Sequence, residues 1–106
     1  MKLLTEKDIA QIPPLYATEN EKNPLIYVKI FTPDANWSWY IIEYNPATKI
    51  AFGYVCGLEE ELGYFDIKEL EILRGPLGFS PVKALFFEKK TLDELKKELF
   101  LEYEKS

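Results

Sequence analysis

The sequence predicts an α+β fold, in which a mainly antiparallel sheet of about four to five strands packs with helices. Segments rich in β-branched and aromatic residues fill the middle of the chain, and helix start signals lie near both ends. The length of 106 residues is typical of one domain, and we expect residues 1–106 to form a single unit with its own core.

The predicted strands cover residues 25–32, 37–44, 50–56, 62–65 and 82–87. Alternation in the first strand places Ile26, Val28 and Ile30 on one face. The strand at 37–44 has both tryptophans and apolar residues on both faces, which is typical of a central strand covered by helices. Strict alternation assigns one face to Trp37, Trp39 and Ile41, and the other to Ser38, Tyr40, Ile42 and Tyr44.

Three helices are predicted from their capping residues. Thr5 opens the first, which Pro13 and Pro14 end, and Asp66 opens the second, which stops before Gly75. Thr91 opens the third, which runs to about residue 105 with an apolar stripe of Leu92, Leu95, Leu99 and Tyr103. The expected element order is therefore α-β-β-β-β-α-β-α.

Composition points to the cytoplasm and away from nucleic acid. The net charge is −5, and a protein that binds phosphates directly needs a basic patch. The single cysteine, Cys56, fits a reducing compartment. The first residues lack the apolar segment of a signal peptide, and no apolar run approaches the roughly 20 residues that span a bilayer.

The absence of histidine excludes most familiar catalytic centres. Without it there is no Ser-His-Asp or Cys-His nucleophilic system and no usual nitrogen ligand for zinc. The five glycines never take a nucleotide-binding spacing. We therefore predict no catalytic residues, no metal and no cofactor. Any catalysis would have to use carboxylates, lysine or tyrosine.

Two turns beside the aromatic strands carry the candidate interaction or ligand site. We expect them at residues 33–37 and 59–65. Both tryptophans could stack a ring ligand, but aromatic residues on a half-buried sheet more often form core. The only arginine could clamp a carboxylate, or it could complement the dipole of the preceding helix. The candidate residues are Asp34, Asn36, Trp37, Glu61, Tyr64 and Arg74.

An ordered set of short motifs spans nearly the whole chain. They are Lys2-Leu3-Leu4-Thr5, Pro13-Pro14-Leu15-Tyr16, Phe31-Thr32-Pro33-Asp34, Trp37-Ser38-Trp39-Tyr40, Phe52-Gly53-Tyr54-Val55, Glu61-Leu62-Gly63-Tyr64-Phe65 and Leu73-Arg74-Gly75. In this set the chain resembles the bacterial domain-of-unknown-function family 2958. The resemblance implies a small protein of mobile genetic elements without an assigned activity. Family members usually have an acidic, histidine-containing segment where this chain has Val82-Lys83-Ala84-Leu85, so any role of that segment does not carry over.

These observations favour a non-catalytic accessory protein that binds a protein partner. An acidic chain of a mobile element could act as an anti-defence inhibitor that docks on a basic nuclease or CRISPR-type surface. The alternative is a small-molecule binder or a minor carboxylate-based enzyme that uses the turns at 33–37 and 59–65. The sequence leaves both a monomer and a homodimer open.

Overall fold

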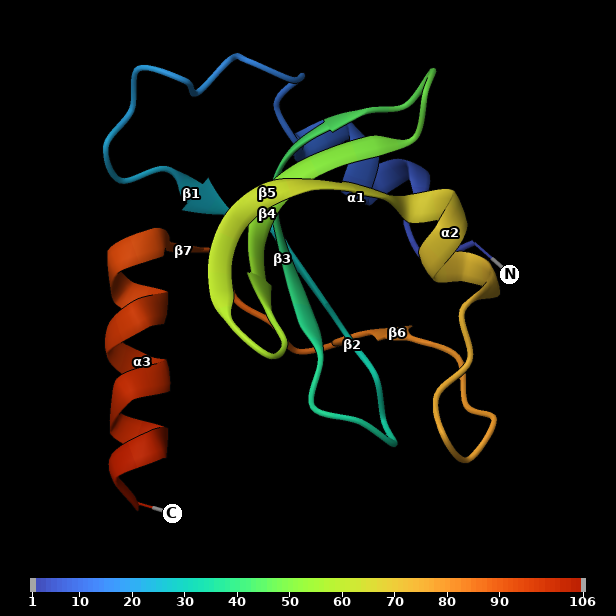
Figure 1. Ribbon diagram of the computed structural model, residues 1–106. Helices are drawn as coiled ribbons and strands as arrows, with labels where there is room; N and C mark the ends of the chain where they lie inside the picture. The colour runs from blue at the N-terminus through green and yellow to red at the C-terminus, as the bar shows by residue number, and fades with distance from the viewer. Residues whose placement is uncertain (1, 106) are drawn as a thin grey trace.

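The computed structural model describes residues 2–105 and confirms the α+β fold (Figure 1). A five-stranded antiparallel sheet has the strand order β5-β4-β3-β2-β6. Its strands are β2 (Val28–Phe31), β3 (Ser38–Asn45), β4 (Ile50–Cys56), β5 (Glu60–Asp66) and β6 (Val82–Lys83). A separate antiparallel pair consists of β1 (Leu25–Ile26) and β7 (Lys90–Thr91). The helices are α1 (Glu6–Gln11), α2 (Ile67–Ile72) and α3 (Leu92–Lys105).

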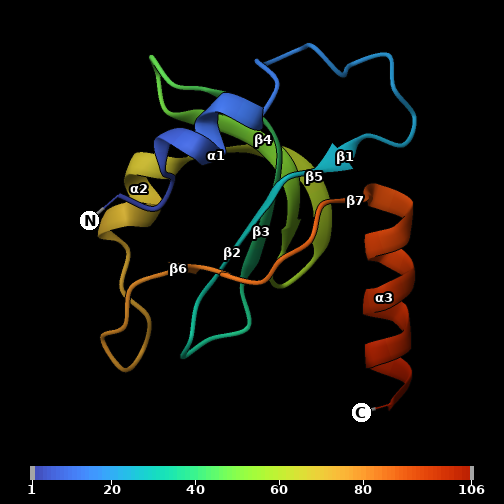
Figure 2. The same ribbon diagram turned by 180° about the vertical axis from the view of Figure 1, so that it is seen from behind.

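Helices cover both faces of the sheet, with α1 and α2 on one side and α3 on the other (Figure 2). The first core cluster lies under α1 and α2 and includes Ile30, Trp39 and Ile41 from the sheet. The second lies under α3, where Tyr40 and Ile42 meet side chains of that helix. This confirms that the aromatic strand β3 is central and buried on both faces.

The predicted caps of the helices are present. Thr5 accepts a hydrogen bond from the backbone N–H of Asp8, and Asp8 in turn accepts from the N–H of Thr5. Thr91 and Glu94 make the same reciprocal pair at the start of α3. Asp66 caps α2 by accepting from the N–H of Lys68. Each cap satisfies backbone donors that have no partner within the helix.

A β-bulge corrects the face prediction for β3. The register with β4 shifts between Ile41 and Glu43, so Tyr44 packs in the same cluster as Trp39 and Ile41 and not on the face of Ser38 and Tyr40. One extra residue in a strand moves every following side chain to the other face. The sequence carries no clear signal for this bulge.

The predicted strand at 25–32 is two strands. The extended segment is interrupted at Tyr27, so β1 pairs with β7 while β2 joins the main sheet. Ile26 therefore packs in the cluster under α3, whereas Val28 and Ile30 pack in the other cluster. The prediction that these three residues share a face was wrong.

The predicted strand at 82–87 is also shorter than expected. Only Val82–Lys83 is extended, and the chain then turns outward, which leaves Leu85 and Phe86 exposed. The strand predicted from residue 37 begins at Ser38. Tyr103 follows the predicted stripe of α3, but 82% of it is exposed because the last turns of the helix extend past the buried residues Leu92 and Leu95.

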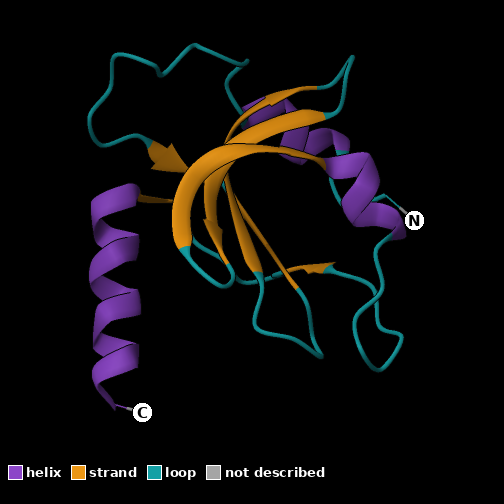
Figure 3. Cartoon of the chain, in the orientation of Figure 1, coloured by secondary structure: helices purple, strands orange, loops and turns teal. Residues whose placement is uncertain are grey.

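Antiparallel order places the connections of the sheet at two ends. The β2–β3 and β4–β5 connections lie at one end, and the β3–β4 turn lies at the other (Figure 3). The two candidate turns therefore belong to the same end of the sheet.

Candidate interaction surface

Asp34 fastens two segments of the chain that are distant in sequence. One oxygen of its carboxylate, Oδ2, accepts hydrogen bonds from the backbone N–H groups of Leu77 (2.8 Å) and Phe79 (3.3 Å). Gly75 lies directly against the same carboxylate, and a Cβ at this position would overlap it. Within residues 2–105, the other oxygen, Oδ1, is buried and has no hydrogen-bond partner. The β2–β3 turn thus holds the loop that follows α2.

Trp37 links the β2–β3 turn to the β4–β5 turn. Its ring stacks on Trp39, with centroids 5.9 Å apart and planes inclined by 22°. The six-membered ring of Trp37 also covers Gly57, where a Cβ would collide with it. Trp37 is 39% exposed, so one side of it supports the core and the other faces solvent.

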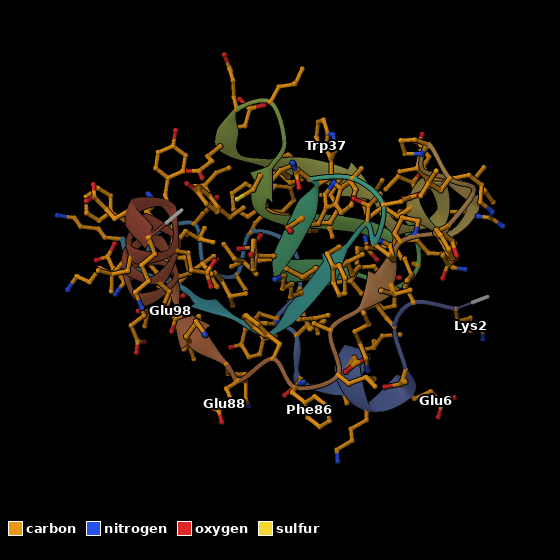
Figure 4. All side chains as sticks on the ribbon, turned by 90° about the horizontal axis from the view of Figure 1, so that it is seen from below. Lys2, Glu6, Trp37, Phe86, Glu88 and Glu98 are labelled. Atoms are coloured by element: carbon orange, nitrogen blue, oxygen red, sulfur yellow. The ribbon has the colours of Figure 1, made fainter. Side chains whose placement is uncertain are left out.

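These contacts link three segments of the chain, and their exposed apolar side chains form what we call the rim: Trp37, Leu58, Leu77 and Phe79. Leu58 follows Gly57 and is 94% exposed, and Leu77 is 77% exposed. Figure 4 shows Trp37 on the side of the molecule that also carries the β4–β5 turn and the loop after α2. Exposed apolar side chains of this size in one place are typical of an interaction site.

The structure brings some of the six candidate residues together and separates others. Asp34 and Trp37 are on the rim, and Asn36 is exposed in the same turn. Arg74 is exposed next to Gly75, and its Nη1 donates to the carbonyl of Leu73 (2.8 Å).

Glu61 and Tyr64 do not share a face of the sheet. Glu61 pairs with Val55 and Tyr64 with Phe52, and alternation along β5 directs the two side chains to opposite faces. Tyr64 contacts Tyr16 and Phe52 instead. The six residues therefore do not converge on one pocket.

The most chemically varied cluster lies under α3. Tyr54 donates to Oε2 of Glu60 (3.0 Å), and Lys96 of α3 lies over the Tyr54 ring, 5.5 Å from its centroid. Burial and the hydrogen bond to Glu60 raise the pKa of Tyr54 to about 12. Burial, with a smaller contribution from Glu60, raises the pKa of Cys56 to about 11. Both groups are therefore protonated near neutral pH, and the thiol is not activated.

Tyr40 completes this cluster, and its phenol is also protonated near neutral pH. Burial first, and then the nearby Cys56, raises the pKa of Tyr40 to about 12. Lys29 lies over its ring, 5.6 Å from the centroid. In the described part of the chain, no group of three or more cysteine and carboxylate side chains is placed to hold a metal ion.

The sequence matches the family model "Protein of unknown function (DUF2958)" over residues 3–95. The chain belongs to this family. The match confirms the resemblance seen in the ordered motifs, and it ends inside α3, so the exposed last turns of that helix lie beyond it. No curated protein and no solved structure matches the chain. Within residues 2–105, no helix has both the length and the apolar content to cross a membrane.

Sequence reasoning missed Leu77 and Phe79 as surface residues and Glu43 as a buried one. In the segment Gly75-Pro76-Leu77-Gly78-Phe79, Leu77 lies between a proline and a glycine and Phe79 directly follows that glycine, which is a signal for an exposed loop with an apolar tip. Glu43 is only 2% exposed in the middle of an apolar strand. A charged residue at such a position could have indicated a buried contact with a loop.

Proposed function

We propose that this member of the DUF2958 family is a non-catalytic interaction protein that binds a protein partner through the rim. The observation that carries the proposal is that the Asp34 carboxylate binds the loop of Leu77 and Phe79 to the turn that also carries Trp37. A loop held in place before binding loses little conformational entropy when a partner covers it. Tryptophan is one of the residues most enriched in binding hot spots.

Charge supports a basic partner. Glu59, Glu60 and Glu61 follow Leu58 and are exposed, and the exposed Arg74 directly precedes the loop that carries Leu77 and Phe79. With the net charge of −5, this arrangement would steer a positively charged surface toward the rim. In the mobile-element setting that the family resemblance implies, such a partner would be a basic nuclease or CRISPR-type protein, and the chain would act as an anti-defence inhibitor.

A catalytic function is less well supported. The thiol and the phenols under α3 are held protonated, and Glu61 and Tyr64 project from opposite faces of the sheet. General acid–base work needs groups that converge on one reacting atom with pKa values near the working pH. This geometry favours binding over the alternative of a carboxylate-based enzyme.

Affinity capture from bacterial lysate tests the proposal. The wild-type protein should recover one partner in stoichiometric amount at low salt and less of it as salt rises, because charge attraction is screened. The double variant Leu77→Ser/Phe79→Ser should lose that partner, while the matched variant Leu85→Ser/Phe86→Ser, which removes exposed apolar side chains elsewhere, should retain it. Capture of no stoichiometric partner at either salt, or equal capture by both variants, would contradict binding through the rim.

A further inference from the structure

Tyr16 and Tyr64 form an exposed aromatic ridge at a distance from the rim. Their ring centroids are 6.3 Å apart with planes inclined by 54°, and 61% of Tyr16 and 55% of Tyr64 are exposed. The Phe52 ring packs against the Tyr64 ring, with the two centroids 5.0 Å apart. The aromatic rings therefore stand above the surface with their sides open to solvent.

A hollow lies on each side of this ridge, and both tyrosines line both hollows. The first, of about 680 Å³, extends to the β3–β4 turn and is mainly apolar, with Pro14, Leu15 and Pro46 among its lining residues. The second, of about 240 Å³, is bordered by the exposed carboxylates of Glu19 and Glu21, the buried carboxylate of Glu43 and the amine of Lys22. The pair of hollows is apolar at one end and acidic at the other.

The loop that carries Tyr16 is fixed by a buried carboxylate. Glu43 accepts hydrogen bonds from the backbone N–H groups of Tyr16 and Thr18, both at 2.8 Å, and from the Thr18 hydroxyl. Tyr16 has a φ of 71°, in the left-handed region that non-glycine residues seldom occupy. Burying a carboxylate is costly unless it is fully hydrogen-bonded, and here its hydrogen bonds hold Tyr16 in place. The ridge is thus formed before any ligand arrives.

We propose that the Tyr16–Tyr64 ridge and its two hollows bind a proline-rich segment of a protein, in the polyproline II conformation, with a basic residue at one end. A polyproline II helix advances about 9 Å in each three-residue turn and has no internal hydrogen bonds, so successive turns fit hollows separated by an aromatic ridge. Aromatic-lined grooves with a preformed shape are the usual sites for such segments. The carboxylates of Glu19 and Glu21 complement the basic end.

Two other occupants fit the site less well. An α-helix with its side chains is about 10 Å wide and needs one continuous apolar groove, whereas the ridge divides this one. A nucleotide base could stack on Tyr16, but its phosphates would meet Glu19 and Glu21. Both remain outcomes that the test can detect.

Titration of isotope-labelled protein with synthetic peptides, followed by nuclear magnetic resonance, tests the proposal. An oligoproline with arginine at one end should shift the signals of Tyr16, Tyr64 and residues 44–50 in a saturable way. Tyr16→Ala and Tyr64→Ala should each weaken binding by about tenfold or more. Glu19→Gln/Glu21→Gln should weaken binding of the arginine peptide by a few-fold and leave an uncharged oligoproline unaffected.

Controls separate this site from the rim. Trp37→Ala should bind the peptide as the wild type does, because Trp37 lies at the other end of the sheet. If the peptide does not bind at the tyrosine ridge, the proposal of a partner at the rim is therefore unaffected. The dispersed spectrum of each variant reports that it is folded. No saturable binding at about 1 mM peptide would overturn the proposal. So would binding that survives both tyrosine substitutions, or equal shifts produced by an amphipathic helical peptide or an oligonucleotide.

Discussion

Asp34 lies so close to Gly75 that any side chain at position 75 would overlap its carboxylate. The same carboxylate accepts hydrogen bonds from the backbone N–H groups of Leu77 and Phe79, so it ties the β2–β3 turn to the loop after α2. A glycine is required here for close approach and not for backbone conformation.

Gly75→Ala should therefore displace the loop. We expect a loss of about 1–3 kcal/mol in the free energy of unfolding, which is typical of an added methyl group in a packed site. Urea denaturation measures this loss. Gly63→Ala is the matched control, because a Cβ at position 63 meets nothing within 4 Å. Equal stability of the two variants would show that the contact between Asp34 and Gly75 is not tight in solution.

Glu43→Gln should loosen the loop that carries Tyr16. A glutamine amide has one acceptor oxygen in place of two, so it leaves the N–H of either Tyr16 or Thr18 without a partner. We expect a loss of about 2 kcal/mol and faster hydrogen exchange at these two amides. Glu19→Gln, which changes an exposed carboxylate of the same loop, should stay within about 0.5 kcal/mol of the wild type. Unchanged exchange in Glu43→Gln would contradict the assigned role.

The pair Asp8–Lys83 should make stability depend on acid pH. Burial alone would raise the pKa of Asp8, but hydrogen bonds from Lys83 (2.7 Å) and Thr5 outweigh it and lower the pKa below its usual 3.8. A carboxylate with a lowered pKa in the folded state stabilises the protein above the unfolded pKa. That contribution disappears as the pH falls through the folded value.

Lys83→Gln should consequently reduce stability by about 1–2 kcal/mol at pH 7 and flatten its decline below about pH 4. Denaturation at a series of pH values measures both effects. Lys90→Gln breaks the more exposed pair with Glu98 and should change stability by less than about 1 kcal/mol. An identical decline at acid pH in wild type and Lys83→Gln would be inconsistent with this account.

Cys56 should react slowly with alkylating reagents. Burial, and then Glu60, raises its pKa to about 11, so at pH 8 the thiolate is roughly two orders of magnitude scarcer than in an unfolded chain. Glu60→Gln should speed the reaction because it removes a nearby negative charge, whereas Glu59→Gln should not. Iodoacetamide labelling followed by mass spectrometry measures these rates. A rate equal to that of the unfolded protein would refute the raised pKa.

Local signals in the sequence predicted the helices well. Thr5, Asp66 and Thr91 cap helices as expected, because a side-chain cap depends on residues a few positions apart. The predicted face of Tyr44 was wrong because of the bulge in β3, and that of Ile26 was wrong because the strand is interrupted at Tyr27. Both features arise from pairing with distant strands, which short-range alternation does not record.

The candidate surface was predicted only in part. The turn at 33–37 was located from its proline and aspartate, but the partner of Asp34 is a loop more than forty positions later. Tyr64 was assigned to the same site as Glu61, and its contact with Tyr16 depends on the hydrogen bonds that Glu43 makes to a remote loop. Such contacts follow from tertiary packing: a charge in an apolar strand indicates that Glu43 has a partner, but a single sequence does not show which loop it binds.

Hydrogen exchange of the protein, alone and with its captured partner, tests the central claim most directly. If the rim is the binding surface, backbone amides in residues 33–37, 57–61 and 75–79 should become protected in the complex, while those in α1 should not change. Protection that leaves these three segments unchanged and appears elsewhere would contradict the claim.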